Sequence, residues 1–272
     1  MKAAKILAVT LMLSAGGTAY ADVTEIHRTG PTCDAEFRAC TLVVRIGGMI
    51  TDQTVDQINA IVDKTRQQAE KNGYSFAFLQ VDLNSRGGTV DAALAIGRIL
   101  RKEQTAAVVN RGAICLSACV LVLAGGSYRG LEGTIGIHRP YLPVPNEEVS
   151  AAGIRVSYQT MLEKIRSYFR EMNIAEGLAD AMLRISPENM HVLTPAELNQ
   201  HGLLEIDPVT AEESDLTQAR YYGLDRQEYM RRKLLAEAQC GGPGSLGTGC
   251  YKSIMKNGYF EQPDFSQFGR QR

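Results

Sequence analysis

The sequence predicts an α/β domain built on a mainly parallel sheet. Short β-branched or apolar runs alternate with longer stretches in which apolar residues recur every three to four positions, and this order is typical of βαβ units. The chain has 272 residues, of which 44% are apolar and 22% are charged. This composition allows one large domain with a substantial core, and it excludes collagen, coiled coil and extensive disorder.

The alternating elements occupy the first half of the chain. The run 118–124 is apolar at every position, so we expect a buried helix there despite its valines. In chain order the predicted elements are a strand at Thr41–Ile46, a helix at Thr51–Asn72, a strand at Phe76–Leu83, a helix at Val90–Lys102, a strand at Ala106–Val109, a helix at Ala118–Ala124 and a strand at Thr134–His138.

Helices dominate the prediction beyond these elements. An amphipathic helix spans Ile154–Phe169, and a shorter helix precedes Pro187. Thr194 is followed by a proline and, three positions on, by a glutamate, which is the pattern of a capped helix start. We expect that helix to end at Gly202 and to be followed by a strand at Leu203–Ile206.

The first residues have the pattern of a secretory signal peptide. Lys2 and Lys5 precede the apolar run Ile6–Ala15, and the small residues Ala19–Ala21 form an A-x-A exit. A buried N-terminal helix fits less well, because the apolar part is short and is followed by Gly16–Gly17. We therefore expect residues 1–21 to be removed and the mature chain to be exported, in a bacterium to the periplasm.

The remaining chain is predicted to contain one α/β domain, residues 22–211, and a helical extension, residues 212–272. The extension includes a helix that begins at Asp225, with Glu228 as its capping-box partner, and a glycine-rich loop. The 29 basic and 30 acidic residues give a net charge of −1, so no polybasic surface points to nucleic acid. No stretch of the predicted mature chain is long and apolar enough to cross a bilayer.

The chain has six cysteines, an even number that suggests disulfide bonds in an oxidising compartment. Six cysteines permit 15 pairings, and the spacing favours neighbours: Cys33 with Cys40, Cys115 with Cys119, and Cys240 with Cys250. Each short loop would stabilise the fold by about 2–3 kcal/mol. No cysteine or histidine spacing resembles a four-ligand zinc site, so we expect no metal.

A first motif with chemical potential is Asn84–Gly88 (NSRGG), at the end of a predicted strand. Gly87 and Gly88 permit a tight turn with positive φ, which leaves backbone N–H groups uncovered, as an oxyanion hole requires. The alternative is a plain connection between a strand and a helix.

A second motif is Cys115–Cys119 (CLSAC), at the start of the apolar helix. Ser117 either caps this helix or acts as a nucleophile. In the second case the helix N-terminus would stabilise negative charge near the hydroxyl, and the N–H of Ala118 would face the substrate oxygen.

A third motif is Ile135–Pro140 (IGIHRP), in which His138 closes a predicted strand. The histidine is either a packed side chain or a general base for Ser117, because imidazole titrates near neutrality. Of the four histidines, His138 is the one at the end of a predicted sheet strand, where open α/β sheets place their sites.

In this order the three motifs resemble the proteolytic subunit of the Clp protease and its relatives. The resemblance covers about Thr41 to Ile206 and implies a Clp/crotonase-like fold of repeated ββα units with a C-terminal helical appendage. It also implies that Ser117 is the nucleophile and His138 the base, with Gly87 or Gly88 and Ala118 as oxyanion donors. Relatives of this fold form rings or trimers, so a homo-oligomer is expected.

The chain departs from the family at the third member of the triad. The family places an aspartate where this chain reads Glu188–Val192 (ENMHV), and the strict match falls on Met190, which cannot orient an imidazole. Asn189 is the preferred substitute, because an amide oxygen can accept from the imidazole N–H, as in Cys-His-Asn enzymes. Glu188 and a dyad with no third member are the alternatives.

These observations predict an exported, ATP-independent serine peptidase that acts on peptides or unfolded proteins without a cofactor. One rival is a crotonase-like enzyme acting on coenzyme A thioesters, which would not need the serine and the histidine. The other rival is an inactive scaffold that kept the fold and lost the reaction. A bond between Cys115 and Cys119 would either be structural or tune activity through the redox state.

Overall fold

The computed structural model describes residues 22–26, 32–34, 39–141, 150–204, 206–240 and 248–259. The chain divides into two compact units, Met1–Glu205 and Ile206–Arg272, so the division falls six residues before the predicted boundary at 211/212. The predicted signal peptide, residues 1–21, lies outside the described residues. No helix in the described ranges is both long and apolar enough to span a membrane.

The first unit is organised around one mixed sheet, whose strands pair in the order β1-β3-β4-β6-β8-β9. The pairs β3–β4, β4–β5, β4–β6, β5–β7 and β6–β8 are parallel, whereas β1, β2 and β9 pair antiparallel with their neighbours. The strands are β1 (Asp22–Ile26), β2 (Thr32–Asp34), β3 (Ala39–Ile50), β4 (Ser75–Gly88), β5 (Ala106–Val109), β6 (Ile114–Leu116), β7 (Tyr128–Leu131), β8 (Thr134–Ile137) and β9 (His191–Val192).

Strand β4 is the branch point of this sheet. Its middle, Gln80–Asp82, pairs with β5, and Ser85 near its end pairs with β6. Two ββα units follow it, β5-β6-α3 and β7-β8-α4, and each places one strand on either branch. The predicted α/β class with a mainly parallel sheet is therefore confirmed, and the ββα repetition is the one that the Clp/crotonase resemblance implied.

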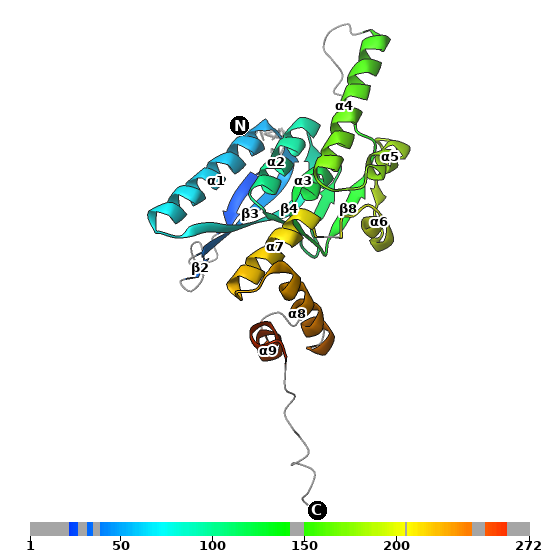
Figure 1. Cartoon of the computed structure of the whole chain (residues 1–272). Coiled ribbons are helices and arrows are strands. Elements are labelled where there is room, and N and C mark those ends of the chain that lie inside the picture. The colour runs from blue at the N-terminus through cyan, green and yellow to red at the C-terminus, as the bar shows by residue number, and fades with distance from the viewer. Residues whose placement is uncertain are drawn as a thin grey trace, which may run out of the picture. The chain divides into compact units, whose positions relative to one another are not determined.

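The helices follow the predicted amphipathic patterns closely. Helices α1 and α2 lie against the sheet (Figure 1), and the helix α3 is buried at every residue, as its apolar composition requires. Thr194 caps α6 through a capping box with Glu197, as predicted. The helices are α1 (Asp52–Lys71), α2 (Val90–Lys102), α3 (Cys119–Gly125), α4 (Ala151–Glu171), α5 (Gly177–Arg184), α6 (Pro195–Gln200), α7 (Pro208–Tyr221), α8 (Arg226–Gln239) and α9 (Gly249–Asn257).

Three local predictions were wrong. The Ser85–Gly88 segment is not a turn but the extended end of β4, which follows β3 past a register shift between Gly48 and Met49. No strand forms at Leu203 and Leu204, the described start of the predicted 203–206 strand, because the Leu203 carbonyl accepts from the Arg129 guanidinium instead.

The third wrong prediction is the capping box between Asp225 and Glu228. Asp225 caps α8 as predicted, accepting from the Glu228 N–H, but the Glu228 carboxylate binds Arg231 and Arg232 rather than closing a capping box.

The second unit consists of α7, α8 and α9 with a small core of its own. Tyr229, Ala236, Tyr251, Ile254 and Met255 are buried within it. A disulfide bond joins Cys240 to Cys250 and so links the end of α8 to the start of α9. The sequence prediction included α8 but missed α7, which Asp207 caps.

Candidate active site

The three motifs lie on neighbouring parallel strands. Strand β4 carries the glycine pair at its end, β6 leads directly into Ser117, and β8 leads directly into His138. The register pairs Ser85 with Cys115 and Cys115 with Ile135, so the three carboxyl ends lie at the same edge of the sheet. Ligand sites of open α/β sheets occupy this edge.

Ser117 occupies an unusual backbone conformation between β6 and α3. Its φ of 56° lies in the left-handed region, which non-glycine residues seldom adopt and which carries strain. The Ser117 N–H donates to Gly136 O on β8 at 2.9 Å. Its hydroxyl does not cap α3, so the capping interpretation does not apply, and the geometry matches the sharp strand-to-helix turn that presents nucleophiles in hydrolases.

A disulfide bond spans this turn. Cys115 and Cys119 are bonded, with their Cα atoms 5.2 Å apart, and both are fully buried. The bond ties Cys115, the middle residue of β6, to Cys119, the first residue of α3, across Ser117. Cys33 and Cys40 stand opposite each other in the β2–β3 register, but their side chains lie outside the described part of the chain.

Gly87 packs directly against the Ser117 turn. A Cβ atom on Gly87 would lie 2.8 Å from Ser117 Cβ, 2.9 Å from Leu116 O and 3.1 Å from the Ala118 nitrogen. Its φ of 108° is also disfavoured for residues with a side chain. A Cβ on Gly88 would lie 2.0 Å from Ile50 O, so neither position tolerates a larger residue.

The two predicted kinds of oxyanion donor differ in their present partners. The Ala118 N–H has no acceptor in the described part of the chain. The Gly87 N–H, by contrast, donates to the Ser85 hydroxyl at 3.1 Å, and that hydroxyl donates to Gly48 O at 2.6 Å. Of these two N–H groups, that of Ala118 is the one without an acceptor among the described residues, and Ser85 holds the glycine segment in place.

His138 is buried at the end of β8, and its ring is held by its own chain. Nδ1 lies 2.9 Å from Arg139 O, and since a carbonyl only accepts, Nδ1 carries the proton and Nε2 keeps its lone pair. The exposed Tyr141 ring stacks on the imidazole with a centroid separation of 6.2 Å. No hydrogen bond joins His138 to Ser117 in the described structure, as is common in enzymes without bound substrate.

The structure does not bring Asn189 to the imidazole. Asn189 is exposed, and its amide donates to Ser186 Oγ at 2.9 Å. The pKa of Glu188 is lowered, first by a backbone hydrogen bond and then by the Ser186 hydroxyl. The Arg139 carbonyl occupies the position that a third triad residue would take at Nδ1.

Met190 is the residue that would lie opposite His138 if the β8–β9 register continued by one position. Strand β9 runs antiparallel to β8, with Gly136 opposite Val192 and Ile137 opposite His191, and one further step would pair His138 with Met190. The Met190 side chain contacts β8, since a Cβ on Gly136 would lie 2.9 Å from its sulfur. The position that matches the family's aspartate is therefore beside the histidine, and it carries no charge.

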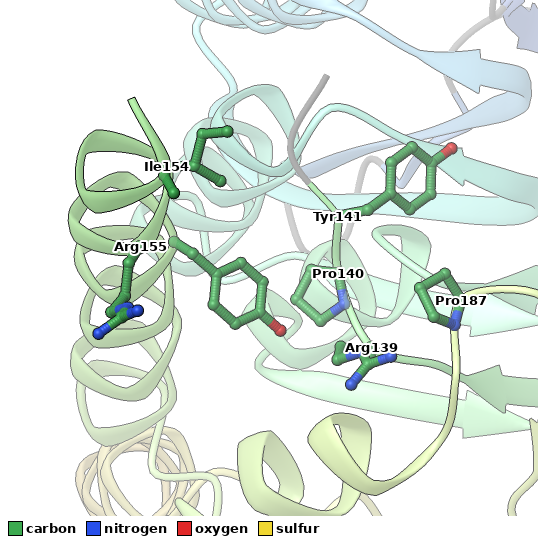
Figure 2. Close-up of a pocket in the computed structure, with 8 residues that line it drawn as sticks. Arg139, Pro140, Tyr141, Ile154, Arg155 and Pro187 are labelled. Atoms are coloured by element: carbon green, nitrogen blue, oxygen red, sulfur yellow. The ribbon is translucent and has the colours of Figure 1, made fainter. Parts of the chain in front are cut away.

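A groove of about 380 Å³ is lined by Arg139–Tyr141, the residues that follow His138 in the sequence. Figure 2 shows it between α4, which carries Ile154, and the segment Arg139–Tyr141, with Pro187 at its other side. Tyr158 of α4 also lines it, and burial raises the pKa of this tyrosine. Its volume lies in the range of small-ligand pockets.

The described ranges contain no cluster of three or more histidine, cysteine, aspartate or glutamate side chains placed to hold a metal ion. Among the described residues, the site offers a hydroxyl on a strained turn, an imidazole whose Nε2 makes no hydrogen bond, and the unpaired backbone N–H of Ala118.

Three contributors were missed by the sequence analysis. Ser85 belongs to the first motif but received no role, although a hydroxyl between two strand ends can bind both backbones. Gly136 is the second, because the side chains of Leu116 and Met190 fill the space that a Cβ atom there would need. The Arg139 carbonyl has no signal in the sequence, because every residue carries one.

Comparison with known proteins gives a limited result. No protein-family model matches the chain, and no curated protein matches it. Among solved structures, two mutants of 1510-N, a membrane-bound stomatin-specific protease, are similar to it, and the second is in complex with a substrate peptide. Each is 22% identical with a TM-score of 0.44; the alignments cover 65% and 64% of this chain and 84% and 78% of those chains. An identity and a score this low support no conclusion about chemistry.

Proposed function

We propose that the protein is an exported serine peptidase in which Ser117 is the nucleophile and His138 the general base. The observation that carries this proposal is the left-handed Ser117, held against Gly87 at the edge of the sheet where His138 also ends its strand. The Ser117 hydroxyl does not cap the following helix, so it remains available to act as a nucleophile, and strained backbone conformations are often found at catalytic sites.

The reaction follows from the free atoms of the site. His138 Nε2 removes the Ser117 hydroxyl proton while Oγ forms a bond to the carbonyl carbon of a peptide. The Ala118 N–H stabilises the oxyanion, and the imidazolium then gives its proton to the leaving amine as the peptide bond breaks. A water molecule, deprotonated by the same nitrogen, hydrolyses the acyl-enzyme. The Arg139 carbonyl keeps the Nδ1 proton in place throughout.

Export to the periplasm is part of this proposal. It rests on the signal-peptide pattern of residues 1–21 and on the two disulfide bonds, Cys115–Cys119 and Cys240–Cys250, which persist in oxidising compartments. Such a compartment supplies no nucleotide, so the substrates we propose are peptides or unfolded segments that need no unfolding motor.

The direct test is labelling of the mature protein with a fluorophosphonate, which reacts with activated serines. We expect labelling at Ser117, its loss in Ser117→Ala, and its retention in the control Ser167→Ala, which removes an exposed hydroxyl on α4. His138→Ala should slow labelling and peptide hydrolysis about 10²–10⁴-fold, the usual contribution of a general base. A folded wild-type protein that resists the probe would refute the peptidase.

A second candidate function is a binding protein that has lost catalysis. Met190 opposite His138 and the occupied Gly87 N–H favour it, because both reduce the means of activating a nucleophile and stabilising an oxyanion. Equal peptide hydrolysis by the wild type and His138→Ala, both at the uncatalysed rate, would select this candidate.

A further inference from the structure

The groove beside His138 combines apolar walls with unpaired cationic side chains. Arg139 and Arg155 line it from opposite sides, and Ile154, Pro140 and Tyr141 supply apolar surface. Neither guanidinium makes an ion pair or a side-chain hydrogen bond in the described structure, whereas Arg166 and Arg170, further along α4, each bind acidic side chains.

The start of α4 supplies no acidic partner for Arg155. The first ten residues of α4, from Ala151 to Thr160, contain no acidic residue. Glu188 interacts with Arg139, but its carboxyl group is held by the backbone and by Ser186, and Arg139 is the last of the contributions to its lowered pKa. The positive charge of the groove is therefore not neutralised by the described part of the chain.

A third polar group in the groove also lacks a partner. The Tyr158 hydroxyl is buried, and it makes no hydrogen bond in the described structure. Buried polar groups nearly always have a hydrogen-bond partner, so a buried hydroxyl without one indicates a site where a bound ligand could supply the acceptor. Two guanidinium groups and one phenol offer a carboxylate the donors it prefers.

The chemistry of His138 decides which part of a substrate lies here. In acyl transfer the imidazolium protonates the leaving amine, so the segment that follows the scissile bond passes the histidine. An extended peptide advances about 3.3 Å per residue. The groove is lined by the three residues that follow His138 in the chain, Arg139–Tyr141, so we assign it to the first few residues after the scissile bond.

We propose that this groove binds a carboxylate of the substrate within the first three residues after the scissile bond, next to an apolar side chain. The inference rests on the proposed peptidase function. The carboxylate comes either from an aspartate or glutamate side chain or from the C-terminus of a short peptide, and the same donors serve both.

The test uses four internally quenched peptides that differ only after the scissile bond: glutamate or glutamine at the second position, each with a free or an amidated C-terminus. We expect kcat/KM to be about tenfold higher for a peptide with the recognised carboxylate than for its neutral counterpart, and the advantage to shrink as salt screens the charges. The glutamate–amide and glutamine–acid peptides distinguish a side-chain carboxylate from a terminal one. Equal rates for all four would overturn the inference while leaving the peptidase intact.

Variants locate the preference in the groove. Arg155→Gln and Tyr158→Phe should each lower the ratio of acidic to neutral kcat/KM toward one, whereas the control Arg111→Gln, which removes an exposed guanidinium outside the groove, should keep it. An unchanged ratio in Arg155→Gln together with Tyr158→Phe would place the preference elsewhere and contradict the inference.

A binding measurement makes the test independent of turnover. Fluorescence anisotropy with the Ser117→Ala protein should give about tenfold tighter binding of the acidic peptide than of its neutral counterpart. Equal affinities refute the carboxylate site. Tighter acidic binding without hydrolysis by the wild type would support the site and refute the peptidase.

Discussion

The serine side of the candidate site is held by backbone packing and a covalent bond, whereas the histidine side depends on weaker and more adaptable contacts. Ser117 is confined by Gly87, by the hydrogen bond to Gly136 and by the Cys115–Cys119 disulfide. Within the described part of the chain, the His138 ring makes one hydrogen bond, to the adjacent Arg139 carbonyl, and stacks on the exposed Tyr141 ring. If the proposed mechanism holds, the serine is preorganised, and substrate binding has to complete the orientation of the imidazole.

Gly87→Ala should break the serine side and have the largest effect. The new methyl group would collide with Ser117 Cβ and Leu116 O in a backbone conformation that alanine disfavours. We expect fluorophosphonate labelling to slow at least 10²-fold, as when oxyanion geometry is lost, and the free energy of unfolding to fall by about 1–3 kcal/mol.

Gly112→Ala is the matched control, because Gly112 also has a positive φ, 81°, but a Cβ there would meet no atom within 4 Å. It should show the conformational cost without the loss of labelling. A Gly87→Ala protein that labels at the wild-type rate would show that the packing against Ser117 does not matter for reactivity.

The double variant Cys115→Ala/Cys119→Ala should have the next largest effect on the serine side. Without the bond, the left-handed Ser117 conformation loses its covalent constraint, and we expect labelling to slow about tenfold as the residue relaxes to an ordinary conformation. Labelling of reduced wild-type protein, with the open bond verified by mass spectrometry, should slow equally.

The Cys240→Ala/Cys250→Ala protein separates stability from positioning. This pair closes a loop in the second unit, so its loss should lower stability by about 2–4 kcal/mol and leave the labelling rate unchanged. Equal labelling rates for both double variants would mean that the bond beside Ser117 is only structural.

Met190→Asp tests whether a carboxylate near His138 increases the rate of peptide hydrolysis. Continued by one position, the β8–β9 register places this residue opposite His138, where a carboxylate could accept the Nδ1 proton and stabilise the imidazolium. We expect peptide hydrolysis to rise severalfold, up to about tenfold. Met190→Leu, which adds no charge, should leave the rate unchanged. Identical rates for the two variants would indicate that the Arg139 carbonyl already orients the ring fully.

Glu197→Gln should have the smallest effect. Glu197 binds His191 of β9 and the Thr194 N–H, so the substitution should change stability rather than activity. Hydrogen bonds from the Thr194 backbone and then from His191 and the Thr194 hydroxyl lower the pKa of Glu197 from 4.5 to about 2. A carboxyl group with a lowered folded-state pKa stabilises the fold above its unfolded pKa, and this stability is lost as the pH falls from about 5 to 2.

The wild type should therefore lose more thermal stability between pH 7 and pH 3 than Glu197→Gln, by a few degrees at most because the group is exposed to solvent. Thermal unfolding of both proteins at the two pH values measures this difference. The same loss in both would show that the capping box does not titrate in this range.

The helices and the order of the motifs were predictable because their signals are local. Helix α2 has the predicted bounds, and α1 begins one residue after the predicted start, since amphipathic periodicity and caps lie within a few residues of each other. The strands β6, β7 and β9 were not predicted. β6 and β9 have only three and two residues, and β7 contains an arginine and a glycine, so their sequences lack the β-branched and apolar runs that predicted β5 and β8.

The third triad position also depends on strand pairing, which the sequence does not reveal. Asn189 and Met190 are adjacent in sequence, and a shift of one residue in the β8–β9 register would exchange which of them faces His138. Composition and spacing contain no measure of that register. The Arg139 carbonyl has even less of a signal, because only the local path of the chain after β8 brings it to Nδ1.

The amino-acid sequence was enough to identify the residues that carry the hydroxyl, the imidazole, the glycines and the paired cysteines, and the order of the helices along the chain. The three-dimensional fold set three further features: β4 pairs with both β5 and β6, Ser117 takes a left-handed conformation against Gly87, and the Met190 side chain lies beside Gly136 on β8. The physical reason is range: helix formation depends on neighbours along the chain, whereas strand pairing and its register are set by side chains that meet only after the sheet has formed.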